Sequence, residues 1–364
     1  MIPERGPHPL SHYLNHVVRA AAGDPDGAAR IERFLTAVRA YQQHPYRRAM
    51  DTPPVVARRG TARVLDYAPP DDRTNGTRGP VALFVPSLVN PPWVLDLSPD
   101  NSLLRWLACQ GVRPMLLDWG EPGPDERQLD LGGYVRERLL PLIAALDAPV
   151  TLVGYCLGGT LTVAAAALSP HVVRLATLAA PWAFSLYGEA QRANLASYWT
   201  SSKPLAQSLG VLPMESLQLA FWSLDPDLME RKFARFGTLD PASPEAENFV
   251  ALEDWANAGP PLSLPAAIQC FERFFRDDDT GQDRWRIGDT PITPEALRLP
   301  SLVIVSNSDR LVPRPAAAAL AERLPSATLR SLDAGHVGMI VGTRARSLLW
   351  EPLRDWLLAP GNAN

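Results

Sequence analysis

Short apolar runs alternate with amphipathic segments along most of the chain after residue 60. Seven runs have the length and the β-branched or aromatic content of strands: residues 64–67, 81–85, 115–118, 150–153, 175–178, 302–305 and 328–332. Apolar positions at helical spacing lie between them, at residues 100–110, 131–146, 158–168, 315–324 and 344–358. Strands that are apolar on both faces and alternate with helices are typical of a mostly parallel, doubly wound sheet. The pattern therefore predicts an α/β domain.

Two parts of the chain depart from this rhythm. Residues 1–50 show two helical stretches with a break at 23–27, where glycine, proline and aspartate gather. Between residues 181 and 299 no comparable strand run occurs, and the spacing is mainly helical. We therefore expect an N-terminal helical lead-in over residues 1–55, an α/β core formed by 56–182 and 298–364, and a helical cap insertion over 183–297.

The expected cap insertion is rich in aromatic residues. Eight of the ten phenylalanines and four tryptophans lie there: Phe184, Phe221, Phe233, Phe236, Phe249, Phe271, Phe274, Phe275, Trp199, Trp222, Trp255 and Trp285. Such a composition fits an apolar lid over a site, and it fits a plain helical core of the insertion equally well.

Charge and cysteine content favour small-molecule chemistry. The 364 residues carry a net charge of −4 with both signs interleaved, so we expect no nucleic-acid partner. No window is long and apolar enough for a membrane span, and residues 1–16 lack the apolar stretch of a signal peptide, which predicts a cytoplasmic protein. The three cysteines, Cys109, Cys156 and Cys270, are an odd and sparse set that fits a reducing compartment.

One cysteine stands in the sequence context of a nucleophile. Residues 154–158 read Gly-Tyr-Cys-Leu-Gly, directly after an expected strand and before an expected helix. This is the context of the nucleophile elbow of the α/β-hydrolase fold, in which a strained turn holds the reactive side chain at the sheet edge. Amides at the helix N-terminus stabilise negative charge there, and the Leu157 N–H is an expected oxyanion donor. Cys156 is thus the predicted nucleophile; the alternative is a small buried cysteine in a glycine-rich turn.

A base and an acid are expected late in the chain, because this fold orders its triad as nucleophile, acid, histidine. Five histidines lie before the sheet or directly behind the elbow helix: His8, His12, His16, His44 and His171. The sixth, His336, follows the last expected strand and is the predicted base. Asp309 follows the penultimate strand and is the predicted acid that orients the imidazole. The alternatives are a buried loop histidine and a helix-capping aspartate, with Asp333 as a weaker candidate acid.

Further residues complete the expected site or are assigned to the core. A backbone N–H of Val89 or Asn90, in the loop after the strand at 81–85, is the expected second oxyanion donor. Cys109 and Cys270 lie on apolar helix faces and are interpreted as core residues. His12 and His16 are one helical turn apart, but no third ligand lies near them in the sequence, so no metal is expected.

These motifs together resemble the polyhydroxyalkanoate synthase family, and most closely the catalytic subunit of its two-component class III. The resemblance covers roughly residues 60–358. Its central motif is Gly-Tyr-Cys-Leu-Gly-Gly at 154–159, similar to the family's lipase-like box in which cysteine replaces serine. The other similar stretches are residues 86–90, 95–97, 102–107, 117–120, 247–249, 253–255, 308–313 and 335–339.

The resemblance implies a specific activity. It implies an acyltransferase that polymerises (R)-3-hydroxyacyl-CoA into polyhydroxyalkanoate and releases CoA, with CoA entering as the substrate thioester and no cofactor. It also implies a homodimer, a second synthase subunit and contact with a growing polyester chain or a granule surface. A cysteine acyl-enzyme is itself a thioester, which suits reversible loading from acyl-CoA. The alternatives are a cysteine-dependent thioesterase or thiolytic polyester depolymerase of the same fold and, from another class, a non-catalytic granule-associated or subunit-binding protein.

Overall fold

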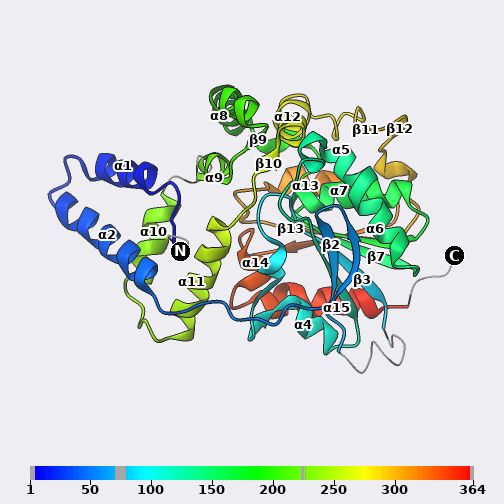
Figure 1. The fold of residues 1–364 in the computed structure, drawn as a ribbon, viewed down its shortest axis with the longest axis horizontal. Coiled ribbons are helices and arrows are strands. Elements are labelled where there is room, and N and C mark those ends of the chain that lie inside the picture. The colour runs from blue at the N-terminus through cyan, green and yellow to red at the C-terminus, as the bar shows by residue number, and fades with distance from the viewer. Residues whose placement is uncertain (1–4, 70–78, 223–224, 226, 361–364) are drawn as a thin grey trace.

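An eight-stranded sheet organises the protein (Figure 1). The computed structural model describes residues 5–69, 79–222, 225 and 227–360. The strand order is β1-β2-β6-β3-β7-β8-β13-β14, with β2 antiparallel to β1 and β6 and the remaining pairs parallel. The strands are β1 Val55–Arg59, β2 Ala62–Asp66, β3 Val81–Val85, β6 Arg113–Asp118, β7 Val150–Tyr155, β8 Val172–Leu178, β13 Ser301–Ser306 and β14 Ala327–Leu332.

Helices cover both faces of this sheet (Figure 1). One face carries α5 Leu131–Tyr134, η3 Val135–Leu139, α6 Leu140–Ala145, α7 Leu157–Leu168 and α13 Arg314–Arg323. The other carries α4 Leu103–Ala108, α14 Gly338–Val341, η7 Arg346–Trp350 and α15 Glu351–Leu358. Alternate residues of β3 enter opposite cores, Leu83 the first and Phe84 the second, because side chains alternate along a strand. This explains why the central strands read as continuous apolar runs.

The chain between β8 and β13 is mainly helical. Its helices are α8 Glu189–Leu209, α9 Met214–Trp222, α10 Leu228–Phe236, α11 Pro244–Asn257, α12 Leu264–Ile268 and the π-helix η5 Gln269–Arg276. Its two-residue strands pair only with one another, β9 Val211–Leu212 with β10 Leu262–Ser263 and β11 Arg286–Ile287 with β12 Thr290–Pro291. Short elements elsewhere are η1 Pro92–Leu95, β4 Asp96–Ser98, β5 Asn101–Ser102, η2 Glu126–Gln128, η4 Phe184–Tyr187 and η6 Pro294–Ala296.

The N-terminal helices α1 Leu10–Ala21 and α2 Gly27–Gln43 pack on this inserted segment, beside α10 and α11 (Figure 1). Phe233 of α10 is fully buried, and the rings of Phe34 and Tyr41 each meet it edge-on with centroids 5.8 Å apart. Arg5 pairs with Asp254 of α11 at 3.0 Å. Three of the insertion's phenylalanines, Phe233 among them, therefore serve a helical core that the two segments share.

The hydrophobic pattern predicts seven of the eight sheet strands and the break between α1 and α2. It misses β1, since Val55–Arg59 lies at the sheet edge with its side chains largely exposed and has an apolar run of only three residues. None of the helices in the described part of the chain is both long and apolar enough to span a membrane.

Candidate active site

Cys156 occupies a strained turn between β7 and α7. Its backbone φ is 56°, a conformation that costs a non-glycine residue roughly 1–3 kcal/mol and that functional sites often retain. Its N–H donates to the Leu178 carbonyl at 2.9 Å, and its carbonyl accepts from the Gly159 N–H at 2.9 Å. The turn is thus fixed from both sides, and the thiol stays partly exposed.

Glycines allow this turn to form. A Cβ at Gly158 would overlap the carbonyl oxygens of Val85 and Pro86, and a Cβ at Gly154 would overlap the backbone of Gly159. The first turn of α7 therefore lies directly against the end of β3. This contact brings the loop at residues 86–90 next to the elbow.

His336 and Asp309, the predicted base and acid, lie together at the ends of neighbouring strands. His336 Nδ1 is 2.6 Å from Asp309 Oδ2, and both residues are only 8% exposed. The second carboxylate oxygen of Asp309 accepts the N–H groups of Leu311 and Val312 at 2.8 and 2.9 Å. The carboxylate is thereby held in place as an acceptor for the imidazole N–H.

The same histidine lies close to Cys156, near enough for the charge of Cys156 to act on its pKa. Because Nδ1 is bound to Asp309, the nitrogen left for the thiol is Nε2. Burial alone would lower the pKa of His336, but the charge of Cys156 and the hydrogen bond to Asp309 raise it to about 10. The arrangement favours a protonated imidazole beside Cys156.

The weaker candidate acid, Asp333, lies elsewhere. Its side chain is exposed and accepts a hydrogen bond from Asn307 Nδ2 at 2.7 Å. The structure thus brings Cys156, His336 and Asp309 together and gives Asp333 a different partner.

Tyr155, which the sequence motifs do not single out, supports the imidazole from its other side. Its ring stacks on that of His336 with centroids 5.1 Å apart and an interplanar angle of 26°. Its hydroxyl donates to the His336 carbonyl oxygen at 3.2 Å. Tyr155 is therefore a positioning residue for His336, and only its place next to Cys156 could have indicated this.

The expected oxyanion donors differ in their present partners. Leu157 opens α7, and backbone N–H groups in a first helical turn have no acceptor within the helix. The Val89 N–H donates to the Ser87 hydroxyl at 3.2 Å. At Asn90, where the backbone N–H is the expected donor, the side-chain Nδ2 donates to the Ala256 carbonyl at 3.4 Å. Leu157 thus presents the simpler donor, whereas Val89 would first have to leave Ser87.

Tyr187 and a second thiol, that of Cys270, lie near enough to Cys156 for its charge to act on both. Tyr187 stacks on Phe184 with centroids 5.7 Å apart and meets Phe275 edge-on at 5.0 Å. Burial and the nearby Cys156 charge raise the pKa of the Cys270 thiol to about 12, so Cys270 stays protonated. The sequence-based interpretation of Cys270 as a core residue did not predict that it lies near Cys156.

The interpretation of Cys109 as a core residue is wrong. Cys109 follows the last residue of α4 and is exposed. The apolar pattern of a helix does not determine whether the residue just beyond its last turn is buried or exposed.

His16, one of the two histidines considered as metal ligands, has an acidic side chain as its neighbour. His16 Nε2 lies 2.9 Å from Asp227 Oδ1. Within the described residues, no group of three or more histidine, cysteine or acidic side chains is placed to hold a metal ion.

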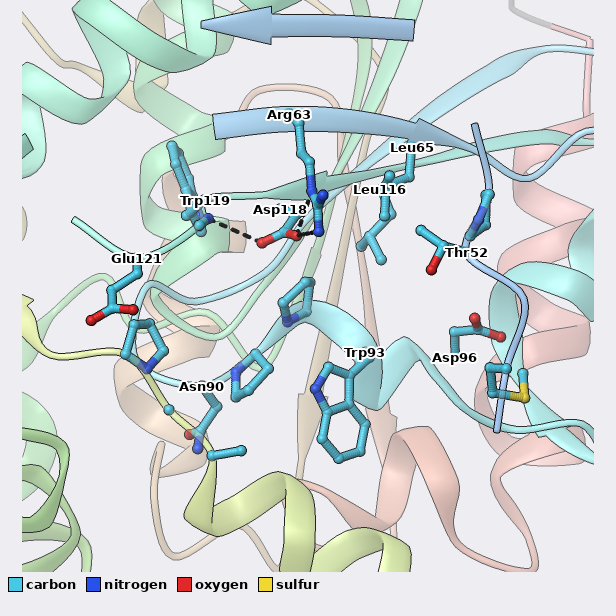
Figure 2. Close-up of a pocket in the computed structure, with 18 of the residues that line it drawn as sticks. Thr52, Arg63, Leu65, Asn90, Trp93, Asp96, Leu116, Asp118, Trp119 and Glu121 are labelled. Carbon is cyan, nitrogen blue, oxygen red and sulfur yellow. Dashed lines mark hydrogen bonds and ion pairs between the residues drawn. The ribbon is translucent and has the colours of Figure 1, made fainter. Parts of the chain in front are cut away.

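A cavity of about 420 Å³ opens beside the loop at residues 86–90 (Figure 2). Leu88 and Asn90 of that loop line it, together with residues from β2, β6 and the loop after α11. Neither Cys156, His336 nor Asp309 contributes to its lining. The cavity is thus a neighbour of the candidate triad and not its immediate surroundings.

Known proteins similar to this chain include ones with the alpha/beta hydrolase fold. A profile described as the alpha/beta hydrolase fold matches residues 124–343. A hydrolase of solved structure from Pseudomonas aeruginosa superposes with a TM-score of 0.53 at 18% identity, covering 82% of this chain and 94% of its own. Both confirm the predicted fold.

Curated sequences confirm the resemblance that the motifs indicate. The poly(3-hydroxyalkanoate) polymerase subunit PhaC of Haloferax mediterranei is 29% identical over 83% of this chain, and the match spans 63% of the Haloferax protein. The protein of the same name from Synechocystis is 27% identical over 76% of this chain and 76% of its own length. This chain is therefore similar to polymerase subunits over most of its length, while spanning less than two thirds of the haloarchaeal relative.

Proposed function

Because the chain belongs to the α/β-hydrolase fold family, we propose that it is a cysteine-dependent acyltransferase that polymerises (R)-3-hydroxyacyl-CoA into polyhydroxyalkanoate with release of CoA. The observation that carries the proposal is the pair of His336 and Asp309, with Nδ1 and Oδ2 2.6 Å apart, next to Cys156 on its strained turn. Similarity to polymerase subunits supports the choice of substrate.

Acyl loading is the first proposed step. The Cys156 thiolate attacks the thioester carbonyl carbon of the acyl-CoA, and the Leu157 N–H stabilises the oxyanion. As the tetrahedral intermediate collapses, the new C–S bond to Cys156 remains and the bond to the CoA sulfur breaks. CoA takes the proton of the His336 imidazolium and leaves as a thiol. One thioester replaces another, so loading is close to neutral in free energy.

Chain extension is the second step. His336, now neutral, accepts the proton of the 3-hydroxyl of another acyl unit, and the resulting oxygen nucleophile attacks the Cys156-bound acyl carbon. An ester bond forms, the bond to Cys156 breaks, and the thiolate is restored beside a protonated His336. Asp309 stabilises the imidazolium and keeps Nε2 directed at the reacting atoms.

Water must be kept from the acyl-enzyme, because hydrolysis would end the chain. His336 and Asp309 are buried, and Tyr187, whose ring packs against Phe184 and Phe275, lies near the thiol. This apolar environment supports transfer to a hydroxyl over release as an acid. We further propose that the protein works as a homodimer with a second synthase subunit on a polyester surface.

Product analysis tests the proposal. The protein is incubated with a short panel of 3-hydroxyacyl-CoAs, with and without a candidate partner subunit, and both free CoA and polymer are measured. We expect both from the wild type and neither from Cys156→Ala. Soluble hydroxyacid as the only product would indicate a thioesterase, and release of hydroxyacyl-CoA from added polymer and CoA would indicate a depolymerase. A Cys156 no more reactive toward a thiol label than Cys109 would indicate a non-catalytic protein.

A further inference from the structure

The cavity beside the loop at 86–90 lies along the same edge of the sheet as Cys156. It opens at the carboxyl end of β6, where Asp118, Trp119 and Gly120 line it. Ligands of open α/β sheets bind at the carboxyl ends of the parallel strands. Strand β3 separates β6 from β7, so the cavity lies two strand spacings, or about 10 Å, from the elbow at the end of β7.

One loop connects the cavity with the nucleophile turn. Residues 86–90 follow β3, touch the start of α7 through Pro86 and line the cavity through Leu88 and Asn90. Trp119, on the cavity wall, donates its indole N–H to the Pro86 carbonyl at 3.0 Å. A chain attached to Cys156 and passing over this loop would enter the cavity.

The charges in the cavity disfavour an anionic ligand. Two arginines line it, and both are paired. Arg63 Nε donates to Asp118 at 2.9 Å (Figure 2). Arg48 lies 3.5 Å from Asp96. Two further carboxylates, those of Asp51 and Glu121, belong to exposed residues of the lining. Acidic groups therefore exceed basic ones, and the phosphates of CoA would be repelled.

The walls suit an uncharged chain with apolar segments. Leu65, Leu116 and the rings of Trp93 and Trp119 provide apolar surface. Five prolines extend it: Pro53, Pro91, Pro92, Pro260 and Pro261. Arg48 lies over the Trp93 ring at 5.0 Å from its centroid, which keeps that side chain in place at the wall. The volume of about 420 Å³ is that of a small-molecule site.

We infer that this cavity binds a neutral oligoester. The bound segment is the part of the growing chain that follows the unit attached to Cys156. CoA approaches the thiol from another direction. The inference rests on the proposed function for the identity of the ligand, and on position, charge and lining for the identity of the site.

The test uses Cys156→Ala protein, which cannot turn over, and a neutral trimer of (R)-3-hydroxybutyrate blocked as its methyl ester. Trimer affinity is measured by calorimetry. Ala258 is exposed and lines the cavity, so Ala258→Trp in this background obstructs the cavity without removing a large native side chain. We expect the trimer to bind and Ala258→Trp to weaken binding about ten-fold or more, a loss of about 1.4 kcal/mol.

Ala28→Trp is the matched control, because Ala28 is exposed on α2 and lies outside the cavity lining. It should leave trimer affinity unchanged, and added CoA should not compete with the trimer. Equal affinity in Ala258→Trp and its parent, or displacement of the trimer by CoA, would overturn the inference. The proposed function fails separately, if wild-type protein forms no polymer from 3-hydroxyacyl-CoA. If wild-type protein forms polymer but Ala258→Trp binds the trimer as tightly as its parent, the assignment of the cavity is wrong and the proposed function still stands.

Discussion

The ring of Tyr155 stacks on the ring of His336 with centroids 5.1 Å apart, and the Tyr155 hydroxyl donates to the His336 carbonyl oxygen at 3.2 Å. Asp309 holds the Nδ1 side of the same imidazole at 2.6 Å. The histidine is thus fixed both at its ring face and at its ring edge. This geometry leaves Nε2 as the ring nitrogen for which we propose the role of base beside Cys156.

Tyr155 variants should separate the two contacts with His336. Tyr155→Phe keeps the stacked ring and loses one hydrogen bond of about 1 kcal/mol, so we expect kcat to fall about five-fold. Tyr155→Leu also loses the ring, worth about another 1 kcal/mol, and kcat should fall further. KM for the acyl-CoA should stay within about two-fold, because Tyr155 acts through His336. Equal loss in both variants would argue against a role for stacking, and a shifted pH profile of kcat would distinguish positioning from general destabilisation.

Asp309→Asn should remove most activity. The amide cannot stabilise the imidazolium as a carboxylate does and favours the wrong tautomer, so we expect a loss on the order of 10³–10⁴ in kcat. Asp333→Asn is the matched control, since Asp333 is exposed and bonded to Asn307. Its rate of CoA release should equal that of the wild type. The reverse ranking would transfer the acid role to Asp333.

His336 should stay protonated well above neutral pH. Its pKa is raised from 6.5 to about 10 against burial, chiefly by the charge of Cys156. A raised pKa means that the protonated form persists to higher pH, so the imidazole NMR signals should begin to titrate only as the pH approaches about 10. In Cys156→Ala the charge is absent, and the pKa should fall. A wild-type His336 that titrates near 6.5 would contradict the effect of the Cys156 charge on the imidazole pKa.

Phe233→Ala tests the packing of the N-terminal helices. The fully buried ring lies between Phe34, Tyr41 and Phe249, and its removal should cost about 3–5 kcal/mol locally. We expect faster limited proteolysis within residues 10–43. Thiol labelling of Cys156 should be unchanged, because the elbow packs in another core. Phe221→Ala, at a partly exposed ring, serves as control. Unaltered proteolysis of Phe233→Ala would contradict the shared core.

Local sequence patterns suffice for the sheet and for the candidate triad. Buried parallel strands need apolar residues on both faces, so each leaves a clear run, and the chain order of this fold directs attention to the loops that hold Asp309 and His336. The edge strand β1 leaves no such run, because it is exposed.

Local sequence patterns do not predict which segments far apart in the chain pack against one another. The packing of α1 and α2 on α10 and α11, and the closeness of Cys270 to Cys156, depend on how the insertion folds back. The cavity is built from several separate segments, none of which carries a motif for it. The Val89 N–H bound to Ser87 likewise depends on a loop conformation that spacing does not encode.

Detection of the acyl-enzyme tests directly whether Cys156 is the nucleophile. Wild-type protein is mixed with one equivalent of 3-hydroxybutyryl-CoA and quenched within the first turnover, and the intact and peptide masses are measured together with free CoA. We predict one 3-hydroxybutyryl group on Cys156 for each CoA released, and neither adduct nor CoA from Cys156→Ala. CoA release without an adduct on Cys156, an adduct on Cys270 or Cys109 instead, or undiminished CoA release by Cys156→Ala would contradict Cys156 as the nucleophile.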